Sequence, residues 1–307
     1  MSLVVIRPGM VTTIQDLGRW GYQHVGVPVA GPMDWYSHRL ANQLVGNDAD
    51  AAALEITLIG PELEALEPTT CVVQGAQFDA TLNGEPVDVQ RPFVIPTGRR
   101  LRFGARRNGA RATLAVGGGF DVPAEFGSRS TSLISAMGAF DGRPLRAGDV
   151  LPVGVQNRPP VPSTGRPLKL PEGGARVRVI RGPHDARFTS QAVEDLFTSR
   201  FTITAQSNRM GYRLDGPPLA HAGSADILSD ATPIGSLQVP ASGQPILLMA
   251  DRQTTGGYPK ICTLITADLP IAGQLAPGDW IEFIECTRNE AVAALREREA
   301  MLQGSDA

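Results

Sequence analysis

Short runs of apolar and β-branched residues, separated by Gly, Pro and Asn, recur along the whole chain. Val, Ile, Thr and Phe dominate these runs, as they do in β-strands. Turn residues at short intervals predict many strands joined by tight turns. Asn-Gly and Asp-Gly pairs are hairpin signals, because these residue types tolerate positive φ. Examples are Asn83-Gly84, Asn108-Gly109 and Asp141-Gly142. We expect strands at residues 3–6, 70–73, 112–116, 177–180, 201–204, 246–249, 261–266 and 280–284.

Helical spacing of apolar residues is confined to a few segments. Residues 33–45 show it, with Gly46 as a stop signal. Ser190 can cap a short helix that ends at Phe197, and Thr287 with Glu290 forms a capping box before an Ala-rich C-terminal helix. We therefore predict a mainly β chain of sandwich or barrel architecture with a few peripheral helices.

A Pro- and Gly-rich stretch, NRPPVPSTGRPLKLPEGG at residues 157–174, has almost no strand signal, and we interpret it as an interdomain linker. This predicts an N-terminal domain over residues 1–160 and a C-terminal domain over residues 172–307. A length of 307 residues agrees with two domains. Each half ends in a Gly-Asp turn before a strand, PLRAGDVLP and QLAPGDWIEF. Duplication of one barrel would explain the similarity of these two segments, and so would a common hairpin type.

Composition and charge exclude several classes of function. The net charge of −3 gives no reason to expect a nucleic-acid or membrane partner. The three cysteines form no CxxC pair, and the four histidines lack metal-ligand spacing, so no metal site is expected. The N-terminus does not resemble a signal peptide, and no apolar run reaches the roughly 18 residues of a membrane span. We expect a cytoplasmic protein.

The clearest candidate for chemistry is DRQTTGGYPK at residues 251–260, between two predicted strands. Its small residues can present backbone N–H groups as an anion-binding nest. Lys260, one of only two lysines, can supply a point charge, and Asp251 can act as a base. A long hairpin loop that turns at Gly-Gly is the alternative. The P-loop pattern is absent. The candidate residues here are Asp251, Gln253, Thr254, Thr255, Gly256, Gly257, Tyr258 and Lys260.

Three further segments combine polar side chains with glycines. SNRMGYRLDG offers Asn208, Arg209 and Tyr212 as hydrogen-bonding groups, with an edge strand after a polar loop as the alternative. TTIQDLGRWGYQHVGVPVAGP contains Gln15, Asp16 and Arg19 among aromatic residues, with an ordered loop as the alternative. GGGFDVPAEFGSRST at residues 117–131 ends in hydroxyl groups that can bind an anion.

In these segments the chain resembles the biotin-dependent carboxyltransferase family, which includes the C subunit of 5-oxoprolinase (KipA) and allophanate hydrolase subunit 2. The resemblance rests on TTIQDLGRWGYQHVGVPVAGPMD, NQLVGNDADAAALEIT, GSRST, GRPLRAGD, SNRMGYRLDG, DRQTTGGYPK and QLAPGDWIEF, which span residues 4–285 in order. It implies two cyclophilin-like β-barrel domains. It also implies a KipI-like partner, the B subunit of 5-oxoprolinase, and in that enzyme a third partner, the lactam-opening A subunit.

The resemblance implies a function as part of an ATP-dependent 5-oxoprolinase, an amide-directed hydrolase that converts 5-oxoproline, ATP and water to glutamate. ATP, with or without Mg²⁺, would act in the complex. The chain has no Met-Lys-Met site, so biotin would have to be carried by another protein. The alternatives are a carboxyltransferase subunit of a urea carboxylase type, a non-catalytic regulator of a KipI-like kinase inhibitor, and a stand-alone binding barrel.

Both activities act on a small amide and need fixed donors for a developing oxyanion. On this basis Arg209, Thr254, Thr255 and Lys260 are expected donors, and Asp251 or Tyr212 is expected to handle a proton. Asn208, Gln253, Gly256, Gly257 and Tyr258 are expected to bind substrate. Gln15, Asp16 and Arg19 are expected to line the same cleft or an interface between subunits.

Overall fold

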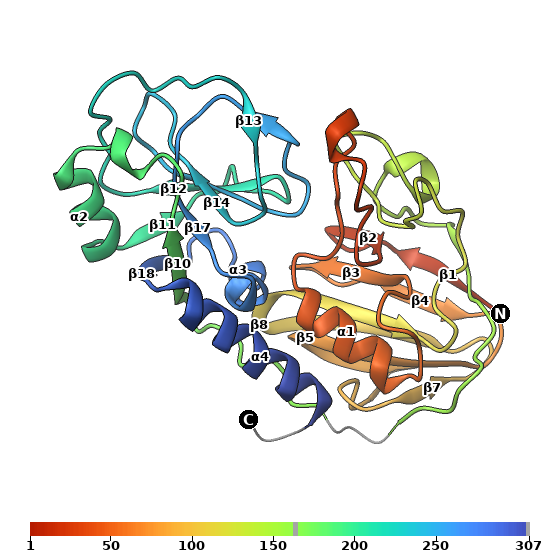
Figure 1. Cartoon of the computed structure of the whole chain (residues 1–307). Coiled ribbons are helices and arrows are strands. Elements are labelled where there is room, and N and C mark those ends of the chain that lie inside the picture. Colours follow the sequence, from red (N-terminus) through yellow and green to blue (C-terminus); the bar gives the residue numbers. More distant parts are fainter. Residues whose placement is uncertain (162–164, 305–307) are drawn as a thin grey trace. The chain divides into compact units, whose positions relative to one another are not determined.

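The computed structural model describes residues 1–161 and 165–304, and the chain divides into two compact units (Figure 1). Unit 1 contains Met1–Trp20 and Ala30–Leu170 and resumes at Ala300. Unit 2 contains Gly21–Val29 and Pro171–Glu299. The division at Leu170 falls inside the predicted linker at 157–174, of which residues 162–164 lie outside the described residues. The sequence did not lead us to expect that Gly21–Val29 belongs to unit 2 or that the chain returns to unit 1 at Ala300.

Unit 1 is built on an antiparallel sheet whose main path runs β2-β3-β8-β4-β1-β9, with β5 along β8 and the short β6 and β7 on β5. Its core is aliphatic, with Leu3, Ile14, Leu54, Ile56 and Leu114 almost fully buried. The strands are β1 Ser2–Arg7, β2 Val11–Gln15, β3 Ala53–Thr57, β4 Glu62–Ala65, β5 Thr69–Leu82, β6 Glu85–Pro86, β7 Phe93–Ile95, β8 Arg100–Val116 and β9 Val150–Pro152.

The long strand β8 joins the parts of unit 1. Its first half pairs with β4 and its second half with β3, while β5 follows its length with bulges. The hairpin predicted at Asn108-Gly109 is wrong, because this pair lies inside β8, where Gly109 takes φ 71° in the bulged region. Asn83-Gly84 does turn between β5 and β6, with φ 55° and 96°, as predicted. Asp141-Gly142 lies in the 3-10 helix η2 (Ala139–Gly142) and makes no hairpin.

Helix α1 (Trp35–Leu44) packs on β5 and β8 in unit 1 and confirms the helix predicted at residues 33–45. The Asp34 carboxylate caps it, accepting from the backbone N–H of Ser37 at 2.9 Å. Tyr36 and Leu40 lie on its buried face.

Unit 2 is a closed barrel with the strand order β10-β17-β14-β15-β12-β11-β18, in which β10 and β18 are parallel and the other neighbours antiparallel. Along β10, Val177 and Val179 face the core while Arg176 faces solvent, the period-two pattern of a half-buried strand. The strands are β10 Gly174–Arg181, β11 Phe201–Ile203, β12 Gly211–Asp215, β13 Asp230–Ala231, β14 Ser236–Gln238, β15 Ile246–Leu248, β16 Thr255–Gly256, β17 Lys260–Leu264 and β18 Trp280–Glu285.

The helices of unit 2 lie outside its barrel (Figure 1). Thr189 rather than Ser190 caps α2, one residue earlier than expected. The predicted capping box of α4 is confirmed, since Glu290 Oε2 accepts from the backbone N–H of Thr287 at 2.7 Å. No helix within the described residues has both the length and the apolar character that crossing a membrane requires. The helices are η1 Gln23–Val25, η3 Asp185–Arg187, α2 Ser190–Thr198, η4 Thr266–Asp268, α3 Leu269–Gly273 and α4 Arg288–Gln303.

These observations confirm a mainly β chain of two β-rich parts with a few peripheral helices. The two sheets differ in closure. Unit 2 forms a complete ring, whereas in unit 1 the ends of the path, β2 and β9, do not pair with each other.

Candidate functional site

The segment at residues 251–260 leaves β15 and returns as β17, and in between it is extended. β16 pairs antiparallel with β13, so that Asp230 lies opposite Gly256 and Ala231 opposite Thr255. The backbone N–H of Thr232 also donates to Thr254 O at 3.1 Å. A nest forms where successive backbone N–H groups lie in an αR-αL or turn conformation. Thr255–Gly256 is instead extended as a short strand, and neither Gly256 nor Gly257 has positive φ.

Lys260 is 2% exposed, and its Nζ forms an ion pair with Asp230 Oδ2 at 2.9 Å. This contact keeps the pKa of the Asp230 carboxyl below its usual value. The backbone N–H of Lys260 donates to His184 Nδ1 at 3.3 Å, and burial, followed by the Lys260 charge, lowers the pKa of His184. Lys260 therefore ties β17 to β13, and its ammonium is already engaged by a carboxylate.

Arg209 and Asp251 come from the two strongest motifs, and the structure brings them together as a buried pair. The guanidinium donates from Nε and Nη2 to the two Asp251 oxygens, each at 3.0 Å, and the side chains are 7% and 1% exposed. The backbone N–H of Asp251 donates to Arg209 O at 2.9 Å. Such a bidentate pair fixes geometry, so it joins the two loops beside the site.

A pocket of about 290 Å³ lies between these two loops, and we name it the amide pocket. Its floor is apolar, formed by Met210, Ile246 and Leu248. Four side-chain amides dominate its polar lining, with a guanidinium and a phenol beside them: Gln206, Asn208, Gln238, Gln253, Arg213 and Tyr258.

Gln238 on β14 is the most informative residue of the amide pocket. It is 2% exposed, and its Oε1 accepts from Gln253 Nε2 at 3.1 Å. Its Nε2 is buried and has no hydrogen-bond partner within the described part of the chain. A buried donor without an acceptor costs about 1–3 kcal/mol, so a ligand that supplies a carbonyl oxygen would regain this free energy. Sequence reasoning missed Gln238, because it stands in an ordinary strand pattern.

Gly256 makes room for these amides. A Cβ at this position would lie 2.6 Å from Gln238 Nε2 and 3.1 Å from Gln253 Nε2. At Gly257 the nearest atom, Ile227 O, would be 3.5 Å away, an ordinary contact. Of the two glycines, only Gly256 is required by its neighbours.

The other candidates in unit 2 lie in different environments. Tyr212 is 1% exposed, and its hydroxyl donates to Leu275 O at 3.3 Å, which places it in the barrel core. Asn208 lines the amide pocket, and its Oδ1 accepts from the backbone N–H of Met210 at 2.8 Å. Tyr258 is 41% exposed and also lines the pocket.

Gln15, Asp16 and Arg19 belong to unit 1 and form a separate network. The Asp16 carboxylate accepts from Ser128 Oγ at 2.5 Å, Ser130 Oγ at 2.6 Å and the backbone N–H of Arg129 at 2.5 Å. Gln15 Nε2 donates to Thr131 O at 3.0 Å, and Arg19 Nη2 donates to Ser130 O. The serines of the GSRST segment therefore hold an internal carboxylate, which accounts for the polarity of both segments.

Comparison with known proteins places this fold in a family. The family model for the carboxyltransferase domain, subdomain A and B, matches residues 25–285. The C subunit of the 5-oxoprolinase of Escherichia coli is 39% identical over 297 residues, 97% of this chain and 95% of that protein. The corresponding protein of Haemophilus influenzae is 35% identical over 94% of this chain and 93% of its own length.

Solved structures agree with this assignment. The crystal structure of the K. lactis urea amidolyase superimposes with a TM-score of 0.93 at 32% identity, covering 100% of this chain and 20% of that one. The chain thus spans nearly all of the bacterial proteins but about a fifth of the urea amidolyase. Because the family model matches most of its length and full-length relatives are more than 30% identical, the chain belongs to the carboxyltransferase domain family, subdomains A and B.

Proposed function

We propose that this chain is the C subunit of an ATP-dependent 5-oxoprolinase and that it holds the lactam of 5-oxoproline in the amide pocket. Two partners would complete the enzyme, the KipI-like protein and the lactam-opening protein. The observation that carries this proposal is the buried Nε2 of Gln238, a residue of the pocket lining, which has no acceptor in the described chain. The near full-length likeness to two bacterial proteins named for the same place in 5-oxoprolinase supports it.

In this proposal Gln238 donates to the lactam carbonyl. Gln253 orients Gln238, because it donates to Gln238 Oε1 and so leaves the Nε2 end for the ligand. A donor fixed in this way stabilises negative charge that develops on the carbonyl oxygen when the amide is attacked. Asn208 and Tyr258 bind the rest of the ring, while Met210 and Leu248 contact its methylene groups.

The remaining candidates act by positioning. The Arg209–Asp251 pair fixes the two loops. The Lys260–Asp230 pair fixes β13, on which β16 and its neighbours Thr254 and Gly257 lie. Tyr212 supports β12 from the core. Support for a triphosphate here is weak, because Thr255–Gly256 is an extended strand and the Lys260 ammonium is paired with Asp230. We therefore assign ATP to the partner proteins, and any biotin to a separate carrier.

The test is glutamate formation from 5-oxoproline and ATP by this chain reconstituted with the KipI-like and lactam-opening partners. Gln238→Leu keeps most of the side-chain volume but removes the donor, and it should lower kcat/KM by about 10²-fold, the usual effect of losing one oxyanion donor. Gln191→Leu, an exposed change on α2, is the matched control. Full turnover by the folded Gln238→Leu complex would contradict the role of the amide pocket.

Carboxyl transfer to urea is the second candidate. The specific observation in its favour is the TM-score of 0.93 with the urea amidolyase structure. Urea also presents one carbonyl oxygen to Gln238, so the amide pocket suits it. Supplying urea, ATP and a carboxylated biotin carrier in place of 5-oxoproline separates the two functions, since only one substrate should be consumed in a way that depends on this chain.

A further inference from the structure

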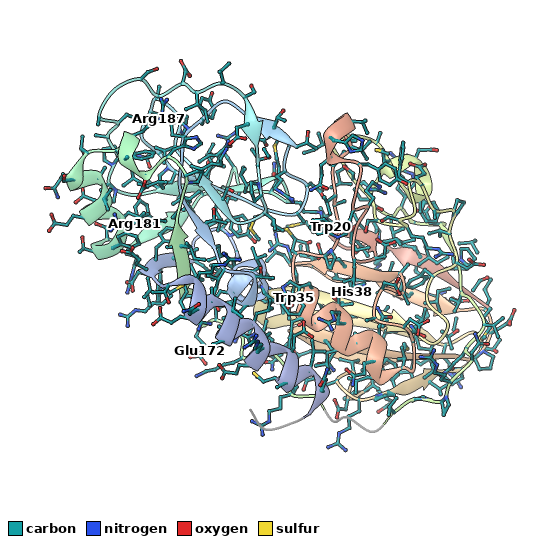
Figure 2. All side chains as sticks on the ribbon, in the orientation of Figure 1. Trp20, Trp35, His38, Glu172, Arg181 and Arg187 are labelled. Carbon is teal, nitrogen blue, oxygen red and sulfur yellow. The ribbon has the colours of Figure 1, made fainter. Side chains whose placement is uncertain are left out.

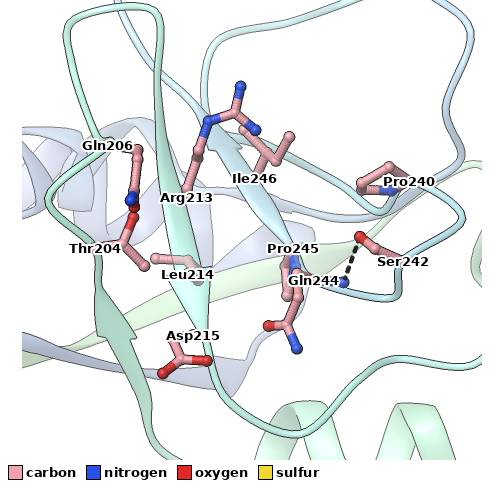
Figure 3. Close-up of a pocket in the computed structure, with 10 residues that line it drawn as sticks. All are labelled: Thr204, Gln206, Arg213, Leu214, Asp215, Pro240, Ser242, Gln244, Pro245 and Ile246. Atoms are coloured by element: carbon pink, nitrogen blue, oxygen red, sulfur yellow. Dashed lines mark hydrogen bonds between the residues drawn. The ribbon is translucent and has the colours of Figure 1, made fainter.

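A second pocket, of about 190 Å³, lies on unit 2 beside the amide pocket (Figure 3). It is formed by the end of β11, the outer face of β12 and the loop before β15, and we name it the Arg213/Asp215 pocket. Gln206, Arg213 and Ile246 line both pockets, whereas Thr204, Asp215 and Gln244 line this one only. Neither the proposed function nor the resemblance uses it.

Two opposite charges line this pocket without neutralising each other. Arg213 and Asp215 are two residues apart on β12, so they lie on the same face with Cα atoms about 6.8 Å apart. Figure 3 shows the guanidinium and the carboxylate directed away from each other along the strand. Throughout the described residues, neither side chain forms an ion pair or a hydrogen bond. The pocket is therefore dipolar, with space between its charged ends.

Buried polar atoms in the wall also lack partners. Thr204 Oγ1 and Gln244 Oε1 are both buried without a hydrogen bond in the described chain. Gln244 is held in place, because its Nε2 donates to Gly216 O at 3.2 Å and its backbone N–H to Ser242 Oγ at 3.3 Å. The Gln244 carbonyl can only accept, so it requires a donor such as an ammonium, whereas the Thr204 hydroxyl can donate to a carboxylate.

From this arrangement we propose that the Arg213/Asp215 pocket binds a small zwitterionic α-amino acid. The ligand carboxylate contacts Arg213 and Thr204, and its ammonium contacts Asp215 and Gln244. The pocket volume of about 190 Å³ suits a small metabolite. A ligand with one charge would leave one end of the pocket without a counter-charge.

This proposal does not depend on the proposed function, but the product of the proposed reaction is a ligand of the kind that this pocket would bind. Opening a carboxylated lactam with water breaks the C–N bond, so the ring nitrogen becomes an amine that is protonated at neutral pH. The lactam carries only a carboxylate, whereas the opened product is an α-amino acid with both charges. The pocket would therefore distinguish product from substrate, next to the site proposed to hold the substrate.

Isothermal titration of the full chain with L-glutamate, L-alanine, 5-oxoproline, propionate and propylamine tests this proposal. At least one amino acid should bind at least tenfold more tightly than the three singly charged compounds. Arg213→Met and Asp215→Asn should each weaken that binding at least tenfold. Arg99→Met, an exposed arginine of unit 1 without an ion pair within the described chain, is the matched control and should leave it unchanged.

Other outcomes overturn the proposal. Equal affinities for the amino acid and propionate would show that Asp215 does not contribute to binding. If neither amino acid bound, the pocket would not be an amino-acid site. If Gln238→Leu abolished amino-acid binding while Asp215→Asn did not, the ligand would occupy the amide pocket instead. Because these titrations use the isolated chain, failure of the reconstituted 5-oxoprolinase assay would not affect their result.

Discussion

Gly256 and Gly257 are neighbours of identical chemistry in very different surroundings. The space that Gly256 leaves open is needed by the amides of Gln238 and Gln253, while Gly257 faces a backbone oxygen at an ordinary distance. We predict that Gly256→Ala displaces these amides and lowers kcat/KM for 5-oxoproline at least tenfold in the reconstituted complex. Gly257→Ala, the matched control, should stay within about twofold of the wild type. Equal activity of both variants would show that the amide pair lies outside the reaction.

The buried Arg209–Asp251 pair leads to a prediction about stability. Removing one partner of such a pair typically costs about 3–5 kcal/mol, because the other charge stays buried. Asp251→Ala should lower the free energy of unfolding of unit 2 by this amount in urea titrations. Replacing both residues, as in Arg209→Met with Asp251→Leu, should restore most of the loss. A single-variant loss below about 1 kcal/mol would mean that water reaches the guanidinium.

At the scale of elements, the Asp16 carboxylate anchors the segment from Glu125 to Thr131 to the end of β2. It accepts two hydroxyl and two backbone hydrogen bonds in a site where Asp16 is 8% exposed. The neighbourhood contains left-handed residues, Phe126 at φ 51° and Ala136 at φ 49°, and such conformations persist only where their surroundings hold them.

We predict that Asp16→Ala loosens this segment. Amide hydrogen exchange at Arg129 should become at least tenfold faster, and protease cleavage near Phe126 should increase, since the segment loses its acceptor. Asp121→Ala is the control, because the only contact of the Asp121 side chain among the described residues is an exposed ion pair with Arg129 at 3.3 Å, a type that contributes about 0–1 kcal/mol. Identical exchange in the two variants would contradict an anchoring role.

At the scale of the whole molecule, the stability of unit 1 should depend on pH through a buried histidine. His38 on α1 of unit 1 (labelled in Figure 2) is 1% exposed, and its Nε2 accepts from Asn42 at 3.1 Å. Burial lowers its pKa to about 4, although the Asp16 charge acts in the opposite direction. Unfolded histidine has a pKa of about 6.5. Between these values the unfolded chain binds a proton that folded unit 1 does not.

The free energy of unfolding of unit 1 should therefore fall by about 3 kcal/mol as the pH decreases from 6.5 to 4, with no contribution from His38 above pH 6.5. In His38→Gln, whose amide oxygen can also accept from Asn42, this part of the pH dependence should disappear. Urea titrations between about pH 7 and pH 4.5 measure the difference. Parallel pH profiles for the two proteins would show that His38 is protonated in the folded state.

Local sequence determined many of the elements, because their causes lie within a few residues. The Thr287–Glu290 capping box and the Asn83-Gly84 turn are set by side chains that act on neighbouring backbone. The two Gly-Asp turns that echo each other also share a mechanism, since Asp149 and Asp279 each accept from the backbone N–H three residues earlier, at 2.7 and 2.8 Å. The eight runs predicted as strands all overlap strands for the same reason.

Tertiary structure decided what these elements do together. Asn108-Gly109 has the sequence of a hairpin turn, but pairing with β5 keeps it inside β8 as a bulge. Asp251 was predicted to handle a proton and Arg209 to donate hydrogen bonds, and the fold pairs the two side chains across 42 residues. Gln238 carries no sequence signal, because its special state depends on tertiary contacts. Gln253 donates to its amide oxygen, and its buried amide nitrogen has no partner in the described chain. Sequence specifies the hydrogen-bonding groups that a residue offers, whereas the fold alone determines which of them are already satisfied.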